Sequence, residues 1–419
     1  MYQIEIAGGR RLAGSVPVHG AKNSVLPILA ATVLGNGTSV IHGCPNLDDV
    51  DSSCEILEYI GCNIKREGST ICVDASTIGK SCIPEEMMHK MRSSITFLGS
   101  MTARLGTAEM GTPGGCELGP RPIDLHIKAL EKIGVAVKER CGRVETRCDS
   151  FVGGEVHFDF PSVGATENIM MAASLARGET VITNPAKEPE ICDLQAFLNK
   201  MGAKISGAGT DCIVIEGVPV LHGAEHRVIP DRIVAATYLC AGIMTGGTVE
   251  LTETNPEHIH AVTAVLRDMG ASIYTNKHAV LLYAPQRIKP IKLLRTMPYP
   301  GFPTDAQAMM TAALTLADGT SMIEENIFEN RFRHAAELSK MGADITTRGN
   351  VAVIRGVKRL VGAPVTAMEL RGGAALVLAG LCAEGISTVS GTSHIDRGYG
   401  SFVEDMQSLG AEIRKIGKA

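Results

Sequence analysis

Two kinds of hydrophobic pattern alternate along the chain, and each predicts a different kind of helix. The first is almost entirely apolar, as in residues 233–244 and 374–383, and predicts a helix buried on all sides. The second has apolar residues on one side only, as in residues 125–133, and predicts an amphipathic helix at the edge of a core. Short apolar runs such as residues 212–215 follow the second kind and predict strands. The chain is therefore expected to form α/β structure.

Glycines end both kinds of helix, and their positions show that the pattern repeats six times. The amphipathic segments end in Leu-x-x-apolar-Gly, with Met for Leu in the last copy, at Gly61, Gly134, Gly202, Gly270, Gly342 and Gly410. The apolar segments end at Gly35, Gly106, Gly178, Gly246, Gly319 and Gly385. Neighbouring glycines of each series are about 70 residues apart, as in a protein built of repeated units. Glycine suits these positions because it adopts the left-handed conformation at a helix end without strain.

Six units in 419 residues predict two domains of three units each. We expect the apolar helices at the centre of each domain, with the amphipathic helices and the sheets around them. Residues 16–22 and Pro230-Asp231 are the candidate linkers. The predicted domains are therefore residues 22–229 and residues 1–21 with 230–419, and a substrate site is expected in the cleft between them.

Composition and charge exclude several classes of protein. The chain has 40 Lys and Arg against 45 Asp and Glu, a net charge of −5, which argues against a general binder of nucleic acid or anionic membranes. It opens with MYQIEIAGGRRL, which does not resemble a signal peptide, and no apolar run reaches the ~18 residues of a membrane span, so a cytoplasmic protein is expected. The 12 cysteines include no CxxC pair, and the histidines lack metal-ligand spacing, so no metal is expected.

Basic and polar residues recur at the starts of the predicted helices. Helix N-termini favour anions, and Arg binds phosphate or carboxylate with two parallel hydrogen bonds, so together these residues predict an anion site. The alternative interpretation of each residue needs no ligand: it is a solvated cation or a helix cap. Thr304 and Gln307 also match a capping box, and Asp305 in the first turn should have a lowered pKa. The segments are Lys22-Asn23, Arg92, Arg121-Pro122, Ser162-Val163-Gly164, Asp231, Thr304-Asp305, Arg331, Glu369-Leu370-Arg371 and Asp396-Arg397.

Residues 111–119 form a segment of a different kind, GTPGGCELG. Its glycines and proline exclude a helix or a central strand and predict a hinged loop. The loop contains Cys116 shortly before Arg121, and nearby cations favour the reactive thiolate. The alternative is a surface loop with an incidental thiol.

Several of these segments together resemble the enolpyruvyl transferases, in the branch that uses UDP-N-acetylglucosamine as acceptor. The resemblance covers residues 1 to about 415 and includes the six-unit layout. Its motifs are Ala21-Lys22-Asn23-Ser24, Gly114-Gly115-Cys116, Arg121-Pro122-Ile123-Asp124-Leu125-His126, Ser162-Val163-Gly164-Ala165-Thr166, Pro303-Thr304-Asp305 and Phe328-Glu329-Asn330-Arg331-Phe332.

This resemblance implies two inside-out α/β barrel domains that close over phosphoenolpyruvate and the UDP-sugar. The implied reaction adds the sugar 3′-hydroxyl to C2 of phosphoenolpyruvate and a proton to C3, and then releases phosphate. It is the first committed step of peptidoglycan precursor synthesis, and it needs no metal or organic cofactor.

The resemblance also implies roles for individual residues. Cys116 would donate the proton to C3 from a lid formed by residues 111–119, and Asp305 would take the hydroxyl proton. Lys22, Arg121 and Arg397 would hold the phosphate, and Arg331 and Arg371 the carboxylate. The residues that would line the UDP-sugar site are Asn23, Arg92, Arg121, Pro122, Ile123, Asp124, Leu125, Ser162, Val163, Gly164, Asp305 and Ile327.

Two other functions stay open at this point. One is the sister transferase that uses shikimate 3-phosphate as acceptor and shares the fold. The other is a non-catalytic paralogue that binds the UDP-sugar.

Overall fold

A computed structural model describes residues 2–111, 123–140 and 142–417. The described chain divides into two compact units. The internal unit comprises residues 20–111, 123–140 and 142–229, and the terminal unit comprises residues 2–19 together with 230–417. The chain thus passes from one unit to the other after His19 and again after Ile229.

The terminal unit contains both ends of the chain. Its strands are β1 (Tyr2–Ala7), β2 (Ala13–Pro17), β17 (Thr248–Thr252), β18 (Ser272–Thr275), β19 (Val280–Tyr283), β20 (Leu294–Arg295), β21 (Thr320–Glu324), β22 (Asp344–Arg348), β23 (Val351–Arg355), β24 (Pro364–Thr366), β25 (Ile386–Ser390) and β26 (Glu412–Gly417). Its helices are α8 (Arg232–Met244), η3 (Pro256–Ile259), α9 (His260–Asp268), η4 (Thr304–Ala306), α10 (Gln307–Leu314), α11 (His334–Lys340), α12 (Leu370–Cys382), α13 (Ser393–Asp396) and α14 (Phe402–Ser408).

The internal unit is built from the same kinds of element. Its strands are β3 (Gly35–Asn36), β4 (Thr38–His42), β5 (Asn63–Glu67), β6 (Thr70–Asp74), β7 (Cys82–Ile83), β8 (Thr107–Gly111), β9 (Ala136–Arg140), β10 (Arg143–Arg147), β11 (Glu155–His157), β12 (Glu179–Thr183), β13 (Lys204–Ser206), β14 (Cys212–Glu216), β15 (Leu221–His222) and β16 (Glu225–Arg227). Its helices are α1 (Lys22–Ala31), η1 (Thr32–Leu34), α2 (Asp48–Ile60), α3 (Glu85–Lys90), η2 (Arg92–Thr96), α4 (Phe97–Leu105), α5 (Asp124–Lys132), α6 (Val163–Ala173) and α7 (Pro189–Lys200).

One sheet pattern recurs in both units. Each four-stranded sheet contains one parallel pair of strands, and its other neighbouring strands are antiparallel, whereas β15 and β3 form a separate parallel pair. This recurrence confirms the six repeated units that the glycine spacing predicts. The four-stranded sheets have the orders β16-β4-β6-β5, β7-β8-β10-β9 and β11-β12-β14-β13 in the internal unit, and β18-β19-β17-β2, β20-β21-β23-β22 and β24-β25-β1-β26 in the terminal unit.

The N-terminal strand completes the last repeat. β1 pairs antiparallel with β25 and with β26, with Ile4 opposite Val389 and Tyr2 opposite Gly417. In the other repeats a strand of a local hairpin takes this place, as β6 does between β4 and β5. Ile4 and Ile6 are buried, so the alternation of the opening segment directs one face of β1 into the core.

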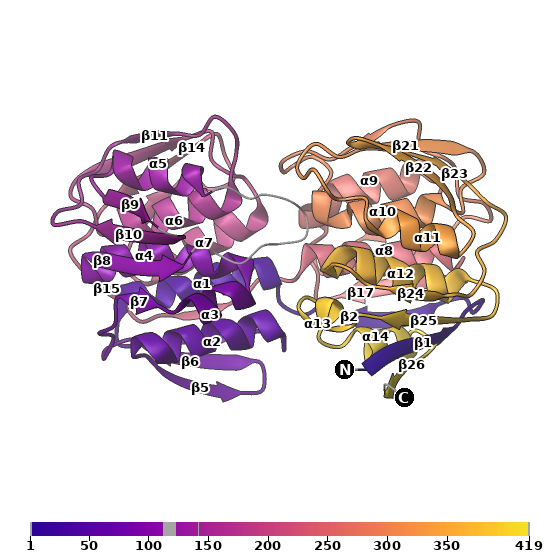
Figure 1. Ribbon diagram of the computed structural model, residues 1–419, viewed down its shortest axis with the longest axis horizontal. Coiled ribbons are helices and arrows are strands. Elements are labelled where there is room, and N and C mark those ends of the chain that lie inside the picture. The colour runs from indigo at the N-terminus through magenta and orange to yellow at the C-terminus, as the bar shows by residue number, and fades with distance from the viewer. Residues whose placement is uncertain (1, 112–122, 141, 418–419) are drawn as a thin grey trace. The chain divides into compact units, whose positions relative to one another are not determined.

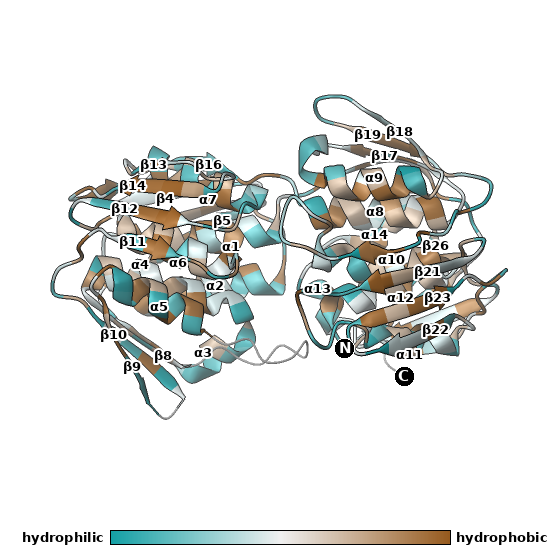
Figure 2. Ribbon diagram, turned by 90° about the horizontal axis from the view of Figure 1, so that it is seen from above, coloured by the Kyte–Doolittle hydropathy of each residue, from teal (hydrophilic) through white to brown (hydrophobic). Residues whose placement is uncertain are grey.

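The apolar helices lie at the centre of each unit, with the sheets around them (Figure 1). In the terminal unit α8, α10 and α12 pack against one another, and in the internal unit α4 packs against α1 and α6. Every residue of α8 after Arg232 is buried, and Figure 2 colours this helix mostly in the hydrophobic half of the scale. Burying each large apolar side chain contributes about 1.5–3 kcal/mol. The inside-out α/β architecture is therefore confirmed.

All the glycines that are predicted to end helices have a positive φ except Gly35. Gly61, for example, has a φ of 109° at the end of α2. Gly35 instead has a φ of −81° and is extended in β3. Glycine is needed there for space, because a Cβ on Gly35 would lie 2.9 Å from the carbonyl oxygen of His222 in β15. The prediction is wrong for Gly178 and Gly319 in another respect, because α6 already ends at Ala173 and α10 at Leu314.

Gly111 is predicted to be part of a loop, but it lies in a strand. It ends the inner strand β8, opposite Arg143 of β10. A glycine fits this strand because a Cβ there would approach Glu85 of α3 to 3.2 Å. The rest of the predicted loop, residues 112–119, lies outside the described residues.

None of the helices in the described chain is both long enough and apolar enough to cross a bilayer. The two apolar segments at residues 233–244 and 374–383 belong to the buried helices α8 and α12, as predicted.

Candidate active site

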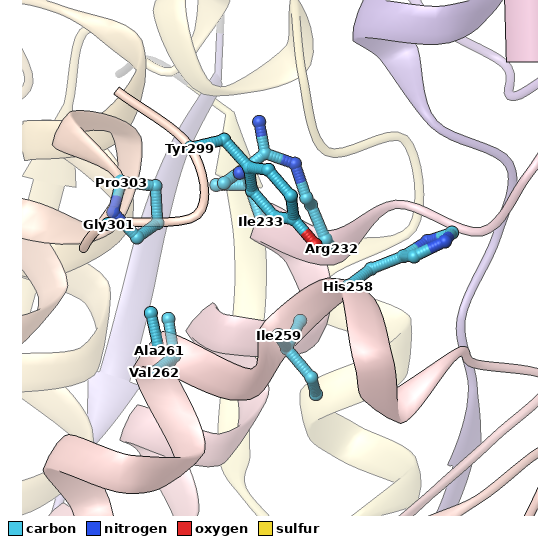
Figure 3. A pocket seen from close by; sticks show the side chains of 9 residues that line it. All are labelled: Arg232, Ile233, His258, Ile259, Ala261, Val262, Tyr299, Gly301 and Pro303. Carbon is cyan, nitrogen blue, oxygen red and sulfur yellow. The ribbon is translucent and has the colours of Figure 1, made fainter. Parts of the chain in front are cut away.

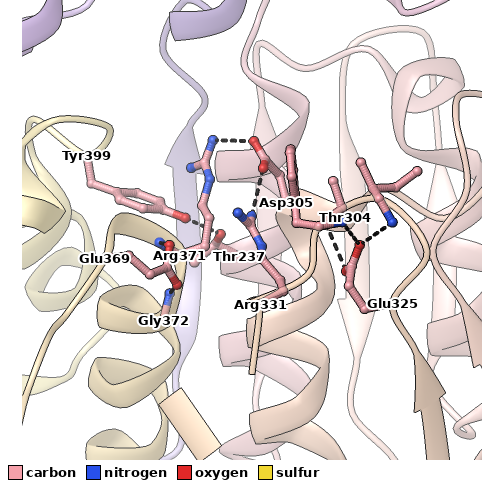
Figure 4. A network of polar contacts seen from close by, with 11 residues as sticks. Thr237, Thr304, Asp305, Glu325, Arg331, Glu369, Arg371, Gly372 and Tyr399 are labelled. Atoms are coloured by element: carbon pink, nitrogen blue, oxygen red, sulfur yellow. Dashed lines mark hydrogen bonds and ion pairs between the residues drawn. The ribbon is translucent and has the colours of Figure 1, made fainter. Parts of the chain in front are cut away.

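One carboxylate and two guanidinium groups meet in the terminal unit (Figure 4). Asp305 Oδ1 accepts a hydrogen bond from Arg331 Nη2 at 2.8 Å, and Asp305 Oδ2 accepts one from Arg371 Nη2 at 3.1 Å. The side chains of Arg331 and Arg371 are only 2% and 3% exposed, whereas that of Asp305 is 28% exposed. The carboxylate is thus the part of this cluster with the most solvent access.

Asp305 lies in η4, and a neighbouring loop holds that short helix in place. Thr304 Oγ1 donates to Glu325 Oε2 at 2.9 Å, and Glu325 Oε1 accepts from the backbone N–H groups of Ile327 and Phe328 at 2.9 and 3.1 Å. The buried Glu325 therefore ties the Asp305 segment to the loop that contains Ile327. The predicted capping box is wrong, because the Thr304 hydroxyl bonds Glu325 and does not cap α10.

Arg371 is the second residue of α12, and a side-chain cap fixes the start of that helix. Glu369 accepts hydrogen bonds from the backbone N–H groups of Arg371, at 2.9 Å, and Gly372. The guanidinium of Arg371 lies 5.4 Å from the centre of the Tyr399 ring, and the Tyr399 hydroxyl is 2.8 Å from Thr237 Oγ1. On the other side, the guanidinium of Arg331 lies 5.4 Å from the centre of the Phe328 ring. Both cations are therefore held in place by packing as well as by Asp305.

The cluster has more positive charge than Asp305 alone can balance. Buried hydrogen-bond donors without an acceptor cost about 1–3 kcal/mol each. Arg331 Nε and Arg371 Nε and Nη1 are buried and have no acceptor in the described part of the chain. A small anion placed here would both neutralise charge and accept from these donors.

The same charges determine the pKa of Asp305. Burial alone would raise the pKa of this carboxyl, but Arg371 and Arg331 outweigh burial and hold the pKa well below its usual range. The predicted direction is confirmed, although its main cause is the two guanidinium groups. Next to Arg331, burial and the charge of that arginine lower the pKa of His334 to about 3, so this imidazole is neutral near pH 7.

A small pocket opens at the start of α8 in the same unit (Figure 3). Its lining includes Arg232, Tyr299 and Pro303, which is two residues before Asp305. The Arg232 guanidinium lies 5.7 Å from the centre of the Tyr299 ring, and its charge also lowers the pKa of Asp305. Arg232 is thus a third cation near this carboxylate, and it is not among the residues predicted from the sequence.

Among the predicted phosphate ligands, Lys22 and Arg397 are described. Lys22 is the first residue of α1 and is buried, and its Nζ lies 2.7 Å from Asp49 Oδ2 of α2. Arg397 follows α13 in the terminal unit, two residues before Tyr399. Cys116, Arg121 and Pro122 lie outside the described residues.

The predicted UDP-sugar residues of the internal unit mostly lie at helix starts. Asn23 is the second residue of α1, Arg92 opens η2, and Ile123 precedes α5. Asp124 and Leu125 begin α5, and Asp124 is 3.8 Å from Lys128. Ser162 caps α6 by accepting from the N–H of Ala165 at 3.4 Å, and Val163 and Gly164 form the first turn of that helix.

Three of these residues, Arg92, Asp124 and Gly164, lie around the ring of His126, which follows Leu125 in the chain. Its ring lies against Gly164, because a Cβ built on that glycine would be 3.0 Å from His126 Cε1. The charges of Arg92 and Asp124 also act on this imidazole. The Arg92, Asp124 and Gly164 segments therefore lie close together around His126 in the internal unit.

Several residues of the site were not predicted, namely Asp49, His126, Thr237, Glu325 and Tyr399. Asp49 had a weak signal as one of three acidic residues at the start of α2. The others act through long-range contacts that local patterns do not reveal. No group of three potential metal ligands occurs among the residues described.

Comparison with known proteins identifies the family to which the chain belongs. The sequence model of EPSP synthase (3-phosphoshikimate 1-carboxyvinyltransferase) matches residues 6–406. Among solved structures, the enolpyruvyl transferase NikO from Streptomyces tendae superposes with a TM-score of 0.90 at 25% identity, covering 100% of this chain and 99% of that one. EPSP synthase from Acinetobacter baumannii has a TM-score of 0.77 at 20% identity, covering 99% of this chain and 100% of that one, and supports the fold.

Fold and sequence thus define an enolpyruvyl transferase, and the chain belongs to the EPSP synthase family. Within that family it is similar to proteins named UDP-N-acetylglucosamine 1-carboxyvinyltransferase. One, from Caldanaerobacter subterraneus subsp. tengcongensis, is 53% identical over 99% of this chain and 100% of its own length. Another, from Symbiobacterium thermophilum, is 50% identical over 98% of this chain and 94% of its own.

Proposed function

We propose that this protein transfers the enolpyruvyl group of phosphoenolpyruvate to the 3′-hydroxyl of UDP-N-acetylglucosamine and releases phosphate. This is the first committed step of peptidoglycan precursor synthesis. The observation that carries the chemistry is the buried pair Arg331 and Arg371 around Asp305, which offers more positive charge than one carboxylate balances. The choice of acceptor is supported by the names of the relatives at 50% and 53% identity.

In this proposal Arg331 and Arg371 bind the carboxylate of phosphoenolpyruvate. Their buried N–H groups without an acceptor in the described chain suit a planar anion. Lys22, Arg121 and Arg397 bind its phosphate. Since Lys22 and Arg397 belong to different units, we propose that the site forms in the cleft between two domains, as the sequence predicts.

The proposal gives Asp305 a basicity that depends on the substrate. With both arginines directed at it, the Asp305 carboxylate is a weak base because its pKa is low. When the substrate carboxylate shares those guanidinium groups, their effect on Asp305 weakens and its pKa rises. Asp305 then orients the sugar 3′-hydroxyl and accepts its proton as the oxygen bonds to C2.

The rest of the reaction needs an acid and an acceptor pocket. Cys116 donates a proton to C3, which gives a tetrahedral intermediate that then loses phosphate and the C3 proton. The nucleotide sugar is bound by Asn23, Arg92, Arg121, Pro122, Ile123, Asp124, Leu125, Ser162, Val163, Gly164, Asp305 and Ile327. Residues 111–119 close over the reactants and exclude water.

Phosphate release from phosphoenolpyruvate, measured with each acceptor alone, tests this function. We expect release with UDP-N-acetylglucosamine and none with shikimate 3-phosphate. Release only with shikimate 3-phosphate would contradict the choice of acceptor. UDP-N-acetylglucosamine binding without release in the presence of phosphoenolpyruvate would instead identify a non-catalytic paralogue.

A further inference from the structure

Asn168 of α6 joins four segments of the internal unit through one buried amide group. The side chain is 1% exposed. Its Oδ1 accepts from the N–H of Gly99 at 2.6 Å, and its Nδ2 donates to the carbonyl oxygen of Ile95 at 3.1 Å. Because a backbone N–H only donates and a carbonyl only accepts, these two contacts determine which side of the amide is oxygen and which is nitrogen.

This orientation determines the tautomer of His126. Nδ2 of Asn168 lies 2.8 Å from Nδ1 of His126. Since Nδ2 is a donor, Nδ1 must be the acceptor, and the proton of the neutral ring lies on Nε2. A proton on Nδ1 would direct two N–H groups at each other.

The surroundings of His126 also favour the neutral ring. Burial and, to a lesser extent, the charge of Arg92 on η2 together lower the pKa of His126 to about 4, against the opposing charge of Asp124 on the same helix. His126 is therefore a neutral donor near pH 7, with its proton on one nitrogen.

The Nε2 side of the ring faces the first turn of α6. A Cβ on Gly164 would lie 3.3 Å from His126 Nε2, so the ring edge is in contact with this turn. His126 is about as buried as Lys22, at 8% exposed, and the hydrogen bond that its ring makes within the described chain is at Nδ1. The start of α6 also carries backbone N–H groups and partial positive charge, so both features favour an oxygen ligand at this place.

We propose that Asn168 is a positioning residue that holds His126 as the Nε2–H tautomer and so provides a neutral hydrogen-bond donor, beside Gly164, for an anionic oxygen of a nucleoside diphosphate. The ligand class rests on the proposed function, which places the UDP-sugar at Ser162, Val163 and Gly164. The tautomer rests on the hydrogen bonds of Asn168 alone. The two parts can therefore be tested separately.

Nitrogen NMR of the ¹⁵N-histidine-labelled protein reads the tautomer without any ligand. His126→Gln assigns the signal. We expect a protonated Nε2 and an unprotonated Nδ1 for His126, with no titration between pH 5.5 and 8, conditions chosen from its lowered pKa. His222 is the internal control, because its Nδ1 lies 2.8 Å from the Gly223 carbonyl oxygen and must donate in the neutral ring. A protonated Nδ1 on His126, or titration near its ordinary pKa, would overturn the proposal.

The variant Asn168→Asp tests the positioning role. One aspartate oxygen can still accept from the Gly99 N–H, but the other replaces the donor to Nδ1 with an acceptor. We expect the proton to move to Nδ1 or the ring to become charged, and the affinity for UDP, measured by calorimetry, to fall about tenfold. Asn199→Asp is the control, because Asn199 also bonds a backbone N–H and carbonyl, those of Ile205, but touches no histidine.

A second variant keeps the test valid if Asn168→Asp does not fold. Gly164→Ala leaves the amide intact but pushes the ring edge away from the helix start, so we expect weaker UDP binding with the Nε2–H tautomer retained. Unchanged UDP affinity in both Gly164→Ala and a folded Asn168→Asp would overturn the role of His126. Failure of the wild-type protein to bind UDP would contradict the proposed function and the ligand assignment together, while the NMR result would still decide the tautomer.

Discussion

At Asp305, one partly exposed carboxylate is shared by two buried guanidinium groups. Removing one member of a buried charged cluster leaves the others uncompensated, which costs more than the loss of an exposed ion pair. The carboxylate therefore stabilises the folded site as well as taking part in the proposed chemistry. This predicts a stability effect that is independent of any substrate.

Asp305→Asn should lower the free energy of unfolding by about 3 kcal/mol, because the amide keeps the shape but removes the negative charge to which both arginines donate. Denaturant unfolding measures this. The matched control is Asp344→Asn, which breaks an exposed pair with Arg355 at 3.2 Å and should cost less than about 1 kcal/mol. Equal losses in the two variants would show that the Asp305 cluster is not a buried charge network.

A second prediction for a single residue concerns Cys116, the proposed proton donor. Cys116→Ser should slow turnover by about a hundredfold or more, because a hydroxyl is a much weaker acid than a thiol and general acid catalysis contributes that much. Binding of UDP-N-acetylglucosamine, measured by calorimetry, should stay close to wild type. Wild-type turnover in this variant would exclude Cys116 as the proton donor.

At the scale of elements, the starts of the central helices position the candidate ligands. Asp231 caps α8, Ser162 caps α6 and Glu369 caps α12. Glu369 matters most for the proposed chemistry because Arg371 is one of the two residues whose N–H groups it accepts from. Loss of a cap of this kind costs about 0.5–2 kcal/mol and allows the first turn to move.

Glu369→Ala should therefore lower stability by about 1 kcal/mol and raise the KM for phosphoenolpyruvate more than the KM for UDP-N-acetylglucosamine. Steady-state kinetics and thermal unfolding measure the two effects, and Glu369→Asp should restore both in part. Asn276→Ala is the control, since it removes a side-chain hydrogen bond to the N–H of His278 in a turn. If Glu369→Ala changes stability alone, the cap does not position Arg371.

At the scale of the whole molecule, each unit contains a buried histidine whose lowered pKa keeps the ring neutral near pH 7. Burial, with a neighbouring arginine, lowers the pKa of His126 to about 4 in the internal unit and of His334 to about 3 in the terminal unit. Between these values and the ordinary histidine pKa of about 6.5, the unfolded chain binds protons that the folded chain does not. The folded state therefore loses stability as the pH falls through this range.

His126→Gln and His334→Gln should each reduce that pH dependence, by at most ~1.4 kcal/mol per pH unit for one proton. Thermal unfolding at pH 7, above the ordinary histidine pKa, and at pH 5, between that pKa and the two lowered ones, measures it. Glu167 acts in the opposite sense, because burial and then Glu190 and Glu188 raise its pKa well above normal. The difference between wild type and variant removes its contribution. A variant as acid-sensitive as wild type would contradict the assignment for that histidine.

The repeat architecture could be predicted from the sequence because its signal is local and occurs six times. Glycines such as Gly61 and Gly106 mark helix ends because the positive φ at these positions favours glycine. The contacts of the site could not be predicted in this way. Arg331 and Arg371 are 40 positions apart in the chain, and only the resemblance assigned them to one anion. Thr304 matched a capping box, but the buried Glu325, which is distant in sequence, competes successfully for its hydroxyl.

The central claim is that the buried arginine pair binds the carboxylate of phosphoenolpyruvate, and kinetics of Arg371→Lys test it most directly. Lysine keeps the charge but loses the planar pair of donors, so the KM for phosphoenolpyruvate should rise about tenfold or more, and the KM for UDP-N-acetylglucosamine much less. Arg359→Lys is the control, because Arg359 forms an exposed ion pair with Glu384. A wild-type KM for phosphoenolpyruvate in Arg371→Lys would contradict the account.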